Sequence, residues 1–177
     1  VSVNPIRTGY NAVADHWVGI TPGTDGLLIL SLVHLLMKAG KIDLDYLSQF
    51  TNAPVLLNAD PNSDDYGLFL RDSDGKPLVI DRATGKPTAF DTPGVQPHLN
   101  GTLAQDGTTH RTVFALMVAE YADEKYAPEN VAEQCGIPAS QIRKLAAEIA
   151  DVAFNQAIEI DQPWTDFRGT THSKMVG

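Results

Sequence analysis

The sequence predicts an α/β fold: a Rossmann-like parallel sheet flanked by helices, with an antiparallel β meander inserted into it. Two observations lead to this prediction. Short β-branched or aromatic runs at residues 1–3 and 16–21 alternate with helical segments, as parallel strands joined by crossovers do. Residues 54–109 instead hold short strand-like runs separated by turn signals. We therefore expect residues 1–177 to form a single α/β domain containing this inserted β and loop segment.

The first part of the chain reads as strand, short helical connection, strand and helix. The first strand, residues 1–3, stops at an Asn-Pro turn, and the second, residues 16–21, stops at a Pro-Gly turn. A helix then begins at Thr24 or Asp25 and runs to Ala39, and the glycine that follows fits a left-handed C-cap. Since leucines lie on nearly all sides of this helix, we expect it to be buried against the sheet.

A shorter helix and the meander follow. Asp43 is the predicted N-cap of this helix, and Tyr46, Leu47 and Phe50 are expected to face inward. The runs "YGLFLRD", "PLVIDR" and "PTAFD" are separated by "SDGK" and "ATGK", which are turn sequences. They predict an antiparallel meander followed by a loop.

The last third of the chain returns to helical periodicity. A helix is predicted over residues 111–126, and a helix pair follows in "VAEQCGIPASQIRKLAAEI". Ala132, Gly136 and Ile142 stand where a helix-turn-helix keeps its small residue, its turn glycine and its apolar lock. Residues 156–164 read as a final buried strand.

The charge of the chain argues against reading this helix pair as a DNA-binding motif. The chain has 13 basic and 22 acidic residues and a net charge of −9, whereas DNA affinity comes mainly from Lys and Arg that neutralise phosphates. In the second helix, the positive charges of Arg143 and Lys144 are offset by the nearby acidic residues Glu148 and Asp151. We expect two helices that meet at a glycine turn inside a larger core, and no nucleic-acid partner.

Several other classes of site lack their sequence signals. The single cysteine, Cys135, excludes a disulfide framework and a cysteine-rich metal site within this chain, and a half-buried structural thiol is expected. No G-x-G-x-x-G, Walker or G-x-S-x-G motif occurs, and the five histidines have no metal-ligand spacing. His34 is expected to be a hydrogen-bonded core residue.

No apolar run reaches the roughly 18 to 20 residues of a membrane span, so no direct membrane contact is expected. Because the chain opens at Val1 inside a strand, we expect it to be a piece of a larger protein.

The loops that follow the two parallel strands are the predicted ligand site. In open parallel sheets, ligands bind outside the carboxyl ends of the strands. The loops supply a cation, hydroxyls, an unhindered backbone and a carboxylate, which suit the edge of a nucleotide. The carboxylate of Asp25 can either cap its helix or accept two hydrogen bonds from guanine, and sequence physics leaves both open. The candidate residues are Asn4, Pro5, Ile6, Arg7, Thr8, Gly23, Thr24 and Asp25.

Two stretches of the chain resemble the molybdopterin-guanine-dinucleotide oxidoreductases of the dimethyl sulfoxide reductase family. The first is "NPIRTGYNAVADHWVGITPGTDGLLILSLVHLLMKAGKIDLDYLSQFTNAP", with its Pro-Arg-like turn after a strand and its "PGTD" before a long apolar helix. The second is the helix pair in "YAPENVAEQCGIPASQIRKLAAEIA". The texture of "TNAPVLL…GLFLRD…DRATGKP" resembles the branch acting on sulfur compounds, namely the thiosulfate, polysulfide and tetrathionate reductases and the sulfite dehydrogenases.

The resemblance implies a function for the candidate residues. This region would be the cofactor-binding α/β domain that holds the guanosine part of a molybdopterin guanine dinucleotide (Mo-bisMGD), with Asp25 as the guanine anchor. Many members have Asp where this chain has Asn4, which leaves the ribose contact open. A [4Fe–4S] centre is expected only outside this chain. The fragment alone would be inactive.

The resemblance also implies partners, and two rival functions stay open beside it. The expected partners are an iron–sulfur electron-transfer protein and the remaining domains of the parent catalytic chain, in a bacterial membrane-associated complex on either the cytoplasmic or the periplasmic face. The rivals are a stand-alone nucleotide-binding or sensory module and the helix-turn-helix DNA binder.

Overall fold

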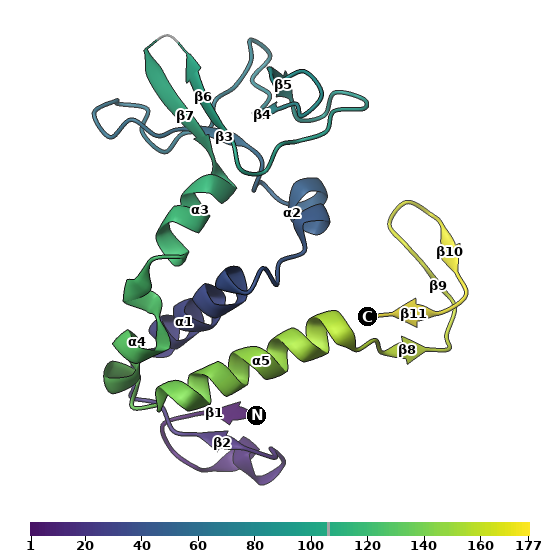
Figure 1. The fold of residues 1–177 in the computed structure, drawn as a ribbon. Coiled ribbons are helices and arrows are strands. Elements are labelled where there is room, and N and C mark those ends of the chain that lie inside the picture. Colours follow the sequence, from purple (N-terminus) through teal and green to yellow (C-terminus); the bar gives the residue numbers. More distant parts are fainter. Residues whose placement is uncertain (106) are drawn as a thin grey trace. The chain divides into compact units, whose positions relative to one another are not determined.

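The computed structural model describes residues 1–105 and 107–177, apart from the side chain of Tyr10. The chain divides into two compact units (Figure 1). Unit 1 consists of Val1–Lys41 together with Glu124–Gly177, and unit 2 consists of Ile42–Asp123. Unit 2 therefore begins before and ends after the segment 54–109 that the turn signals mark as inserted.

Unit 1 contains two parallel strands, as expected from the two β-branched or aromatic runs. β1 (Ser2–Val3) pairs with β2 (Trp17–Val18), and a 3-10 helix, η1 (Gly9–Ala12), lies between them in the chain. The α/β class is confirmed at this coarse level. A Rossmann-like sheet is not found, because in the described residues β1 and β2 form the only parallel pair. Each strand ends after two residues, and the later strands of unit 1 are antiparallel.

Three helices cover this pair and form the core of unit 1. α1 (Asp25–Lys38) packs against α4 (Pro128–Cys135) and α5 (Ala139–Asn155), and η2 (Glu124–Tyr126) precedes α4. Burial of apolar side chains between these elements is the main stabilising contribution. The buried core residues are Val18, Ile20, Leu28, Leu32, Val131, Cys135, Ile137, Ile142, Leu145 and Ala146.

The helix boundaries of unit 1 follow the predicted cap residues closely. Thr24 is the N-cap of α1 and Ala39 its C-cap, and the φ of +65° at Gly40 is the left-handed conformation expected after the helix. α4 begins with Pro128, whose fixed φ suits a first helical position. It ends at Gly136, which is left-handed with φ +69°. As expected, His34 is buried, whereas Cys135, expected to be half-buried, is fully buried in the core.

Unit 2 joins two small antiparallel sheets to two helices. β3 pairs with β7, β7 pairs with β6, and β4 pairs with β5. Its core contains Ala53, Leu99 and Phe114. The elements are α2 (Leu44–Phe50), β3 (Leu56–Asn58), β4 (Leu78–Ile80), β5 (Pro87–Ala89), β6 (Thr102–Gln105), β7 (Thr108–Thr112) and α3 (Val113–Tyr121).

Two expectations for unit 2 are wrong. Tyr46 and Phe50 of α2 are exposed, because they stand four residues apart on one face, with ring centroids 5.4 Å apart, whereas Leu47 packs toward the core. The region predicted as a loop after the meander contains the β6–β7 hairpin. Its residues are mostly polar, so the alternating pattern that predicts a strand is missing.

The end of the chain also differs from the prediction. Residues 156–164 are predicted to form a buried strand, but β8 (Glu159–Ile160) is exposed and pairs with β11 (Met175–Val176). β9 (Trp164–Thr165) pairs with β10 (Thr171–His172). These pairs form an exposed antiparallel ladder, held by cross-strand contacts such as the Trp164–His172 stack. None of the helices in the described residues combines the length and apolarity needed to span a membrane.

Candidate functional site

The two predicted loops leave the same edge of the β1–β2 pair. Val3 is opposite Val18 in a parallel register, so the chain after each of these residues continues in the same direction. The loops therefore carry Asn4–Thr8 and Gly23–Asp25 at the carboxyl ends of adjacent parallel strands. This is the position at which open parallel sheets bind ligands.

The first loop is tied to β2 and closed on itself by Asn4. The backbone N–H of Asn4 donates to the carbonyl of Val18 (3.1 Å), and the Trp17 indole Nε1 donates to the carbonyl of Asn4 (2.9 Å). The Asn4 Oδ1 accepts from the backbone N–H of Ile6 (3.0 Å) across Pro5. Because this turn uses the side-chain oxygen of Asn4, its amide group is left to donate to a ligand.

Asn11 braces the same loop from the 3-10 helix. Its Nδ2 donates to the carbonyls of Ile6 (3.1 Å) and Thr8 (2.9 Å). Its Oδ1 is buried and has no hydrogen-bond partner among the described residues. Asn11 was not predicted from the sequence because it stands outside the strand ends, and asparagine near a turn is too common to single it out.

Arg7 and Thr8 line a hollow of about 460 Å³ together with Gly9, Asn11 and Ala12, which we call the Arg7 hollow. Both Arg7 and Thr8 are exposed. Within the described part of the chain, neither side chain has a hydrogen-bonding or ionic partner. A guanidinium and a hydroxyl are thus available to an anionic or polar ligand.

The second loop is anchored to the end of α4. The backbone N–H of Thr21 donates to the carbonyl of Cys135 (2.9 Å), and the Thr24 hydroxyl (2.7 Å) and backbone N–H (3.2 Å) both donate to the carbonyl of Thr21. Gly23 has φ +84°, a left-handed conformation that a residue with a Cβ rarely adopts. The position of the loop therefore depends on the α4–α5 turn.

Asp25 is the first residue of α1 and is exposed. Thr24 occupies the N-cap position and makes no side-chain cap hydrogen bond, so the capping role considered for Asp25 is not the one it has. No hydrogen bond or ion pair of the Asp25 side chain occurs among the described residues. An acidic side chain here is favoured by the positive end of the helix dipole, and its oxygens remain available to a ligand.

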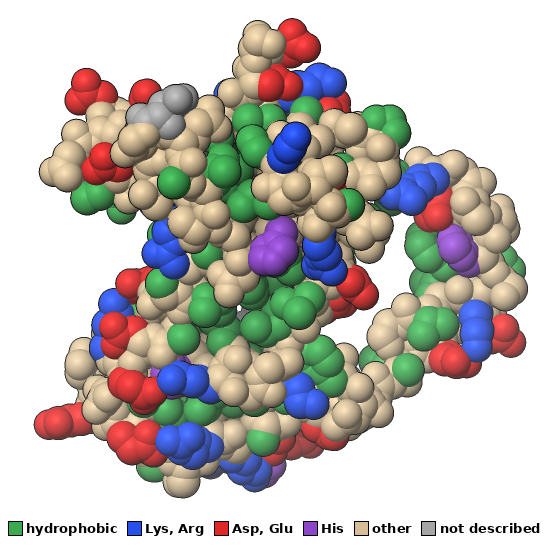
Figure 2. Space-filling model, turned by 45° about the horizontal axis from the view of Figure 1, so that its top comes forward, with side chains coloured by type: hydrophobic (Ala, Val, Ile, Leu, Met, Phe, Trp, Pro, Cys, Tyr) green, Lys and Arg blue, Asp and Glu red, His purple; other side chains and the backbone are tan. Residues whose placement is uncertain are grey.

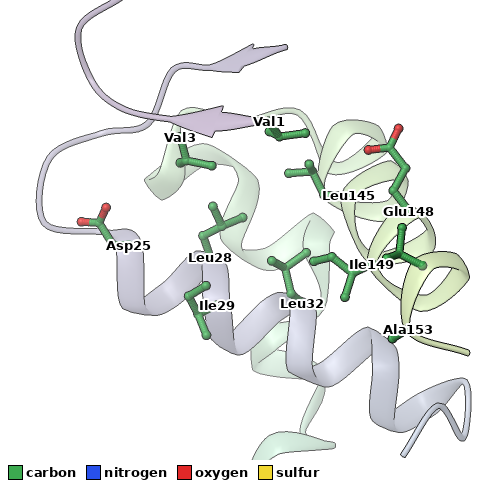
Figure 3. A pocket seen from close by; sticks show the side chains of 11 residues that line it. Val1, Val3, Asp25, Leu28, Ile29, Leu32, Leu145, Glu148, Ile149 and Ala153 are labelled. Atoms are coloured by element: carbon green, nitrogen blue, oxygen red, sulfur yellow. The ribbon is translucent and has the colours of Figure 1, made fainter. Parts of the chain in front are cut away.

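The predicted residues are distributed over two hollows. Thr8 lines the Arg7 hollow, whereas Asp25 lies at one end of a larger pocket between β1, α1 and α5 (Figure 3). This pocket, which we call the α1–α5 groove, has a volume of about 820 Å³ and is almost entirely apolar. The sequence does not predict this groove, because its walls read as an ordinary strand and ordinary buried helix faces.

In the described residues, the unpaired side-chain groups of the two loops include a guanidinium, a hydroxyl and a carboxylate. A carboxylate can accept from the N1–H and N2–H groups of guanine, and a guanidinium can pair with a phosphate. Among the described residues there is no group of three or more His, Cys, Asp or Glu side chains that could hold a metal ion. The described residues of the two loops therefore offer hydrogen-bonding and ionic groups but no metal-ligand cluster.

Unit 2 has a polar hollow of its own, of about 700 Å³. Arg82 and His98 line it together with Asp45 of α2, and all three are exposed. The floor is formed in part by the buried residues Leu99 and Phe114. No motif or spacing in the sequence connects these residues.

The α4–α5 pair has the turn of a helix-turn-helix but serves as an internal step of unit 1. Ile142, the apolar lock, is fully buried in the core with Cys135. Arg143 makes a bidentate ion pair with Glu129 (2.7 and 2.8 Å), which holds the pKa of that carboxyl below its ordinary value.

The remaining basic group of the α5 surface is also paired. Lys144 lies 3.7 Å from Glu148, one helical turn further along α5. On the face seen in Figure 2, basic side chains are dispersed among acidic ones and do not gather into a patch. This arrangement does not offer the cluster of free cations that DNA phosphates require.

Comparisons with known proteins give relatives that match most or all of the chain. A sulfite dehydrogenase subunit of Allochromatium vinosum is 42% identical over all of this chain, which corresponds to 19% of that protein. The alpha subunit of the chlorate reductase of Ideonella dechloratans is 31% identical over 82% of the chain and 18% of that protein. The alpha subunit of the perchlorate reductase of Dechloromonas aromatica is 27% identical over 85% of the chain and 20% of that protein. No family profile matches the chain. The chain thus spans about a fifth of the length of these relatives.

Proposed function

Because the chain belongs to the molybdopterin oxidoreductase family, we propose that it is a cofactor-binding region of the catalytic subunit of a molybdenum oxidoreductase and holds the guanosine part of a molybdopterin guanine dinucleotide. The observation that carries the proposal is the presence of Arg7 and Asp25, both exposed and unpaired in the described residues, in loops that follow adjacent parallel strands. These strand ends are where a dinucleotide binds in related sheets.

Each loop residue has a role in this proposal. The Asp25 carboxylate accepts from the N1–H and N2–H groups of guanine. The Arg7 guanidinium pairs with a phosphate, and Thr8 offers a hydroxyl beside it. Gly23 and Thr24 form the turn that places Asp25, and Asn4, Pro5 and Ile6 form the turn that places Arg7. The Asn4 amide donates a hydrogen bond to a ribose hydroxyl. An aspartate at this position, as in many family members, would instead accept a hydrogen bond from that hydroxyl.

The whole protein is proposed to be an enzyme. The bound cofactor would supply two-electron or oxygen-atom transfer, while the residues of this chain bind and orient its guanosine end. The 42% identity to a sulfite dehydrogenase subunit favours a small substrate such as a sulfur oxyanion. Both relatives are named as subunits, which favours partner subunits for the whole protein. We propose that one of these partners is an iron–sulfur electron-transfer subunit.

A titration of residues 1–177 with guanine nucleotides tests the role of Asp25. GDP is compared with inosine 5′-diphosphate, which lacks the N2 amine, by isothermal calorimetry. A hydrogen bond to a charged group contributes about 1.5–3 kcal/mol, so we expect GDP to bind at least tenfold more tightly. Asp25→Asn should weaken GDP binding and remove this preference. Asp45→Asn, which changes an exposed carboxylate in the first turn of α2, is the matched control and should leave both affinities unchanged.

The result that contradicts the proposal is equal binding of both nucleotides by the wild type and by Asp25→Asn. If the natural reading frame ends near Gly177 and the protein still prefers GDP to inosine 5′-diphosphate, the stand-alone nucleotide-binding module is favoured. Tight binding of duplex DNA at low salt would favour the helix-turn-helix function, against the net charge of −9.

A further inference from the structure

The polar hollow of unit 2, which we call the unit 2 hollow, has two walls fixed to a common floor. One wall is α2, and the other is formed by Arg82 after β4 and by residues 95–100. Leu99 and Phe114 form part of the floor and belong to the buried core of unit 2, against which Leu47 of α2 packs. Since both walls are attached to this core, the shape of the hollow is set by the fold of unit 2.

The segment that contains His98 is paired with the end of β4 in an antiparallel manner. The backbone N–H of Arg82 donates to the carbonyl of Gln96 (2.7 Å), and that of His98 donates to the carbonyl of Ile80 (2.8 Å). The buried Asp81 carboxylate also accepts from the N–H of Gln96 (3.2 Å). Because side chains alternate along each paired segment, Arg82 and His98 lie on the same face, and both line the hollow.

Asp45 presents a carboxylate from the opposite wall. It lies in the first turn of α2, and Ser48 and Gln49 follow it by three and four residues, so the three side chains share one face of the helix. Asp45 and Arg82 are exposed, and in the described part of unit 2 neither side chain has a hydrogen-bonding or ionic partner. The same hollow therefore holds an unpaired anion and an unpaired cation that do not bind each other.

A ligand that carries charges of both signs satisfies this arrangement best. It can form a charge-assisted hydrogen bond with each wall, whereas a ligand with one charge would leave Asp45 or Arg82 without an opposite charge. The buried side chains of Leu99 and Phe114 favour an apolar part between the two charged groups. The volume of about 700 Å³ lies within the range of small-molecule sites.

We propose that the unit 2 hollow binds a zwitterionic small molecule. Its ammonium group is held by Asp45, its carboxylate is held by Arg82 and His98, and its apolar body lies on Leu99 and Phe114. The hollow shares no residue with the two loops of unit 1, so this site does not rest on the proposed function.

The test is a calorimetric titration of the full-length protein with three probes of similar size. 4-(Aminomethyl)benzoate carries both charges, 4-methylbenzoate lacks the ammonium group, and 4-methylbenzylamine lacks the carboxylate. A hydrogen bond to a charged group changes an affinity by about tenfold or more. We therefore expect the zwitterion to bind about tenfold more tightly than either singly charged probe.

Two variants assign the charges to their partners. Asp45→Asn should remove the preference for the zwitterion over 4-methylbenzoate, and Arg82→Gln should remove its preference over 4-methylbenzylamine. Asp64→Asn and Lys86→Gln change exposed charges of unit 2 that do not line the hollow, and they should leave all three affinities unchanged.

Several outcomes overturn the proposal. They are equal affinities of the wild type for the three probes, no measurable binding of 4-(aminomethyl)benzoate, and a preference that survives in either variant. Hydrogen exchange of the unmodified full-length protein gives a second readout that needs no variant. The zwitterion should slow amide exchange in residues 44–49 and 95–100; unchanged exchange in both segments would place its binding elsewhere and exclude this site.

Discussion

Replacing Gly136 by alanine should disturb both the α4–α5 turn and the loop that carries Asp25. Gly136 has φ +69°, and a residue with a Cβ in this conformation costs about 1–2 kcal/mol. A Cβ at this position would also stand 2.9 Å from the Thr21 hydroxyl oxygen, closer than side chains tolerate. Since Thr21 is β-branched, it can yield only by leaving its preferred rotamer, at about 0.5–1.5 kcal/mol.

Gly40 supplies the matched control for this prediction. It lies in the same unit with φ +65°, and a Cβ built there meets nothing within 4 Å. Gly40→Ala should therefore lose only the conformational term. We expect Gly136→Ala to lower the free energy of unfolding of unit 1 by about 1 kcal/mol more than Gly40→Ala does.

The assay is urea unfolding of residues 1–177, followed by the fluorescence of Trp17 in a Trp164→Phe background. Trp17 belongs to β2 and reports on unit 1, whereas Trp164 lies in the exposed C-terminal ladder. Thr21→Ala removes the clashing hydroxyl, so the double variant with Gly136→Ala should lose only what Gly40→Ala loses. The reasoning is refuted if Gly136→Ala and Gly40→Ala lower the free energy of unfolding equally, or if Thr21→Ala does not restore stability to Gly136→Ala. Either result would show that the contact with Thr21 does not contribute to the loss.

Three further predictions concern unit 1. Ile142→Ala, at a fully buried position, should lower the free energy of unfolding by about 2–5 kcal/mol in the same urea experiment; a smaller loss would mean that the core collapses around the gap. Ser31→Ala should raise it by about 1 kcal/mol, because the buried Ser31 hydroxyl has no partner among the described residues; a loss instead would reveal a partner such as an ordered water. Arg143→Gln should lower the melting temperature slightly at neutral pH and have no effect at low pH. Arg143 lowers the pKa of Glu129 in the folded state. The stability that the pair contributes is therefore present above the ordinary Glu pKa and lost as the pH falls through the folded pKa. A difference in melting temperature between wild type and Arg143→Gln that persists at low pH would refute this origin.

The helices of unit 1 could be predicted because their ends carry local signals. Gly40 and Gly136 stop their helices by adopting a left-handed conformation. Each of these signals acts within a few residues and needs no information from the rest of the fold. The same holds for Asp43, whose side chain accepts from the N–H of Tyr46 as an N-cap does.

The strands were harder to predict because their stability depends on partners distant in the sequence. β3 lies in an apolar run, yet its partner β7 is polar and about fifty residues later in the chain. β8 has the alternating residues of a strand, but whether such a strand is buried is decided by the surface it meets. Here it pairs with β11 and stays exposed.

The candidate site shows the same division between local and distant information. The rule that ligands bind at the carboxyl ends of parallel strands identified the loops of Arg7 and Asp25, and the parallel β1–β2 register confirms that both loops leave the same edge. That rule says nothing of the brace formed by Asn11, or of the anchor between Thr21 and Cys135. Both depend on the path of the backbone after the strand has ended.

Asp25 and Arg7 can serve one ligand only if that ligand spans two hollows. Asp25 lines the α1–α5 groove and Arg7 lines the Arg7 hollow, and the two residues belong to different loops. A dinucleotide end has this property, because its base and its phosphates are separate groups that need a carboxylate and a cation respectively. A ligand with a single charged group would leave one of the two side chains without a partner. The affinity of GDP should therefore fall when either Arg7 or Asp25 is replaced, whereas guanosine, which has no phosphate, should respond only to the replacement of Asp25.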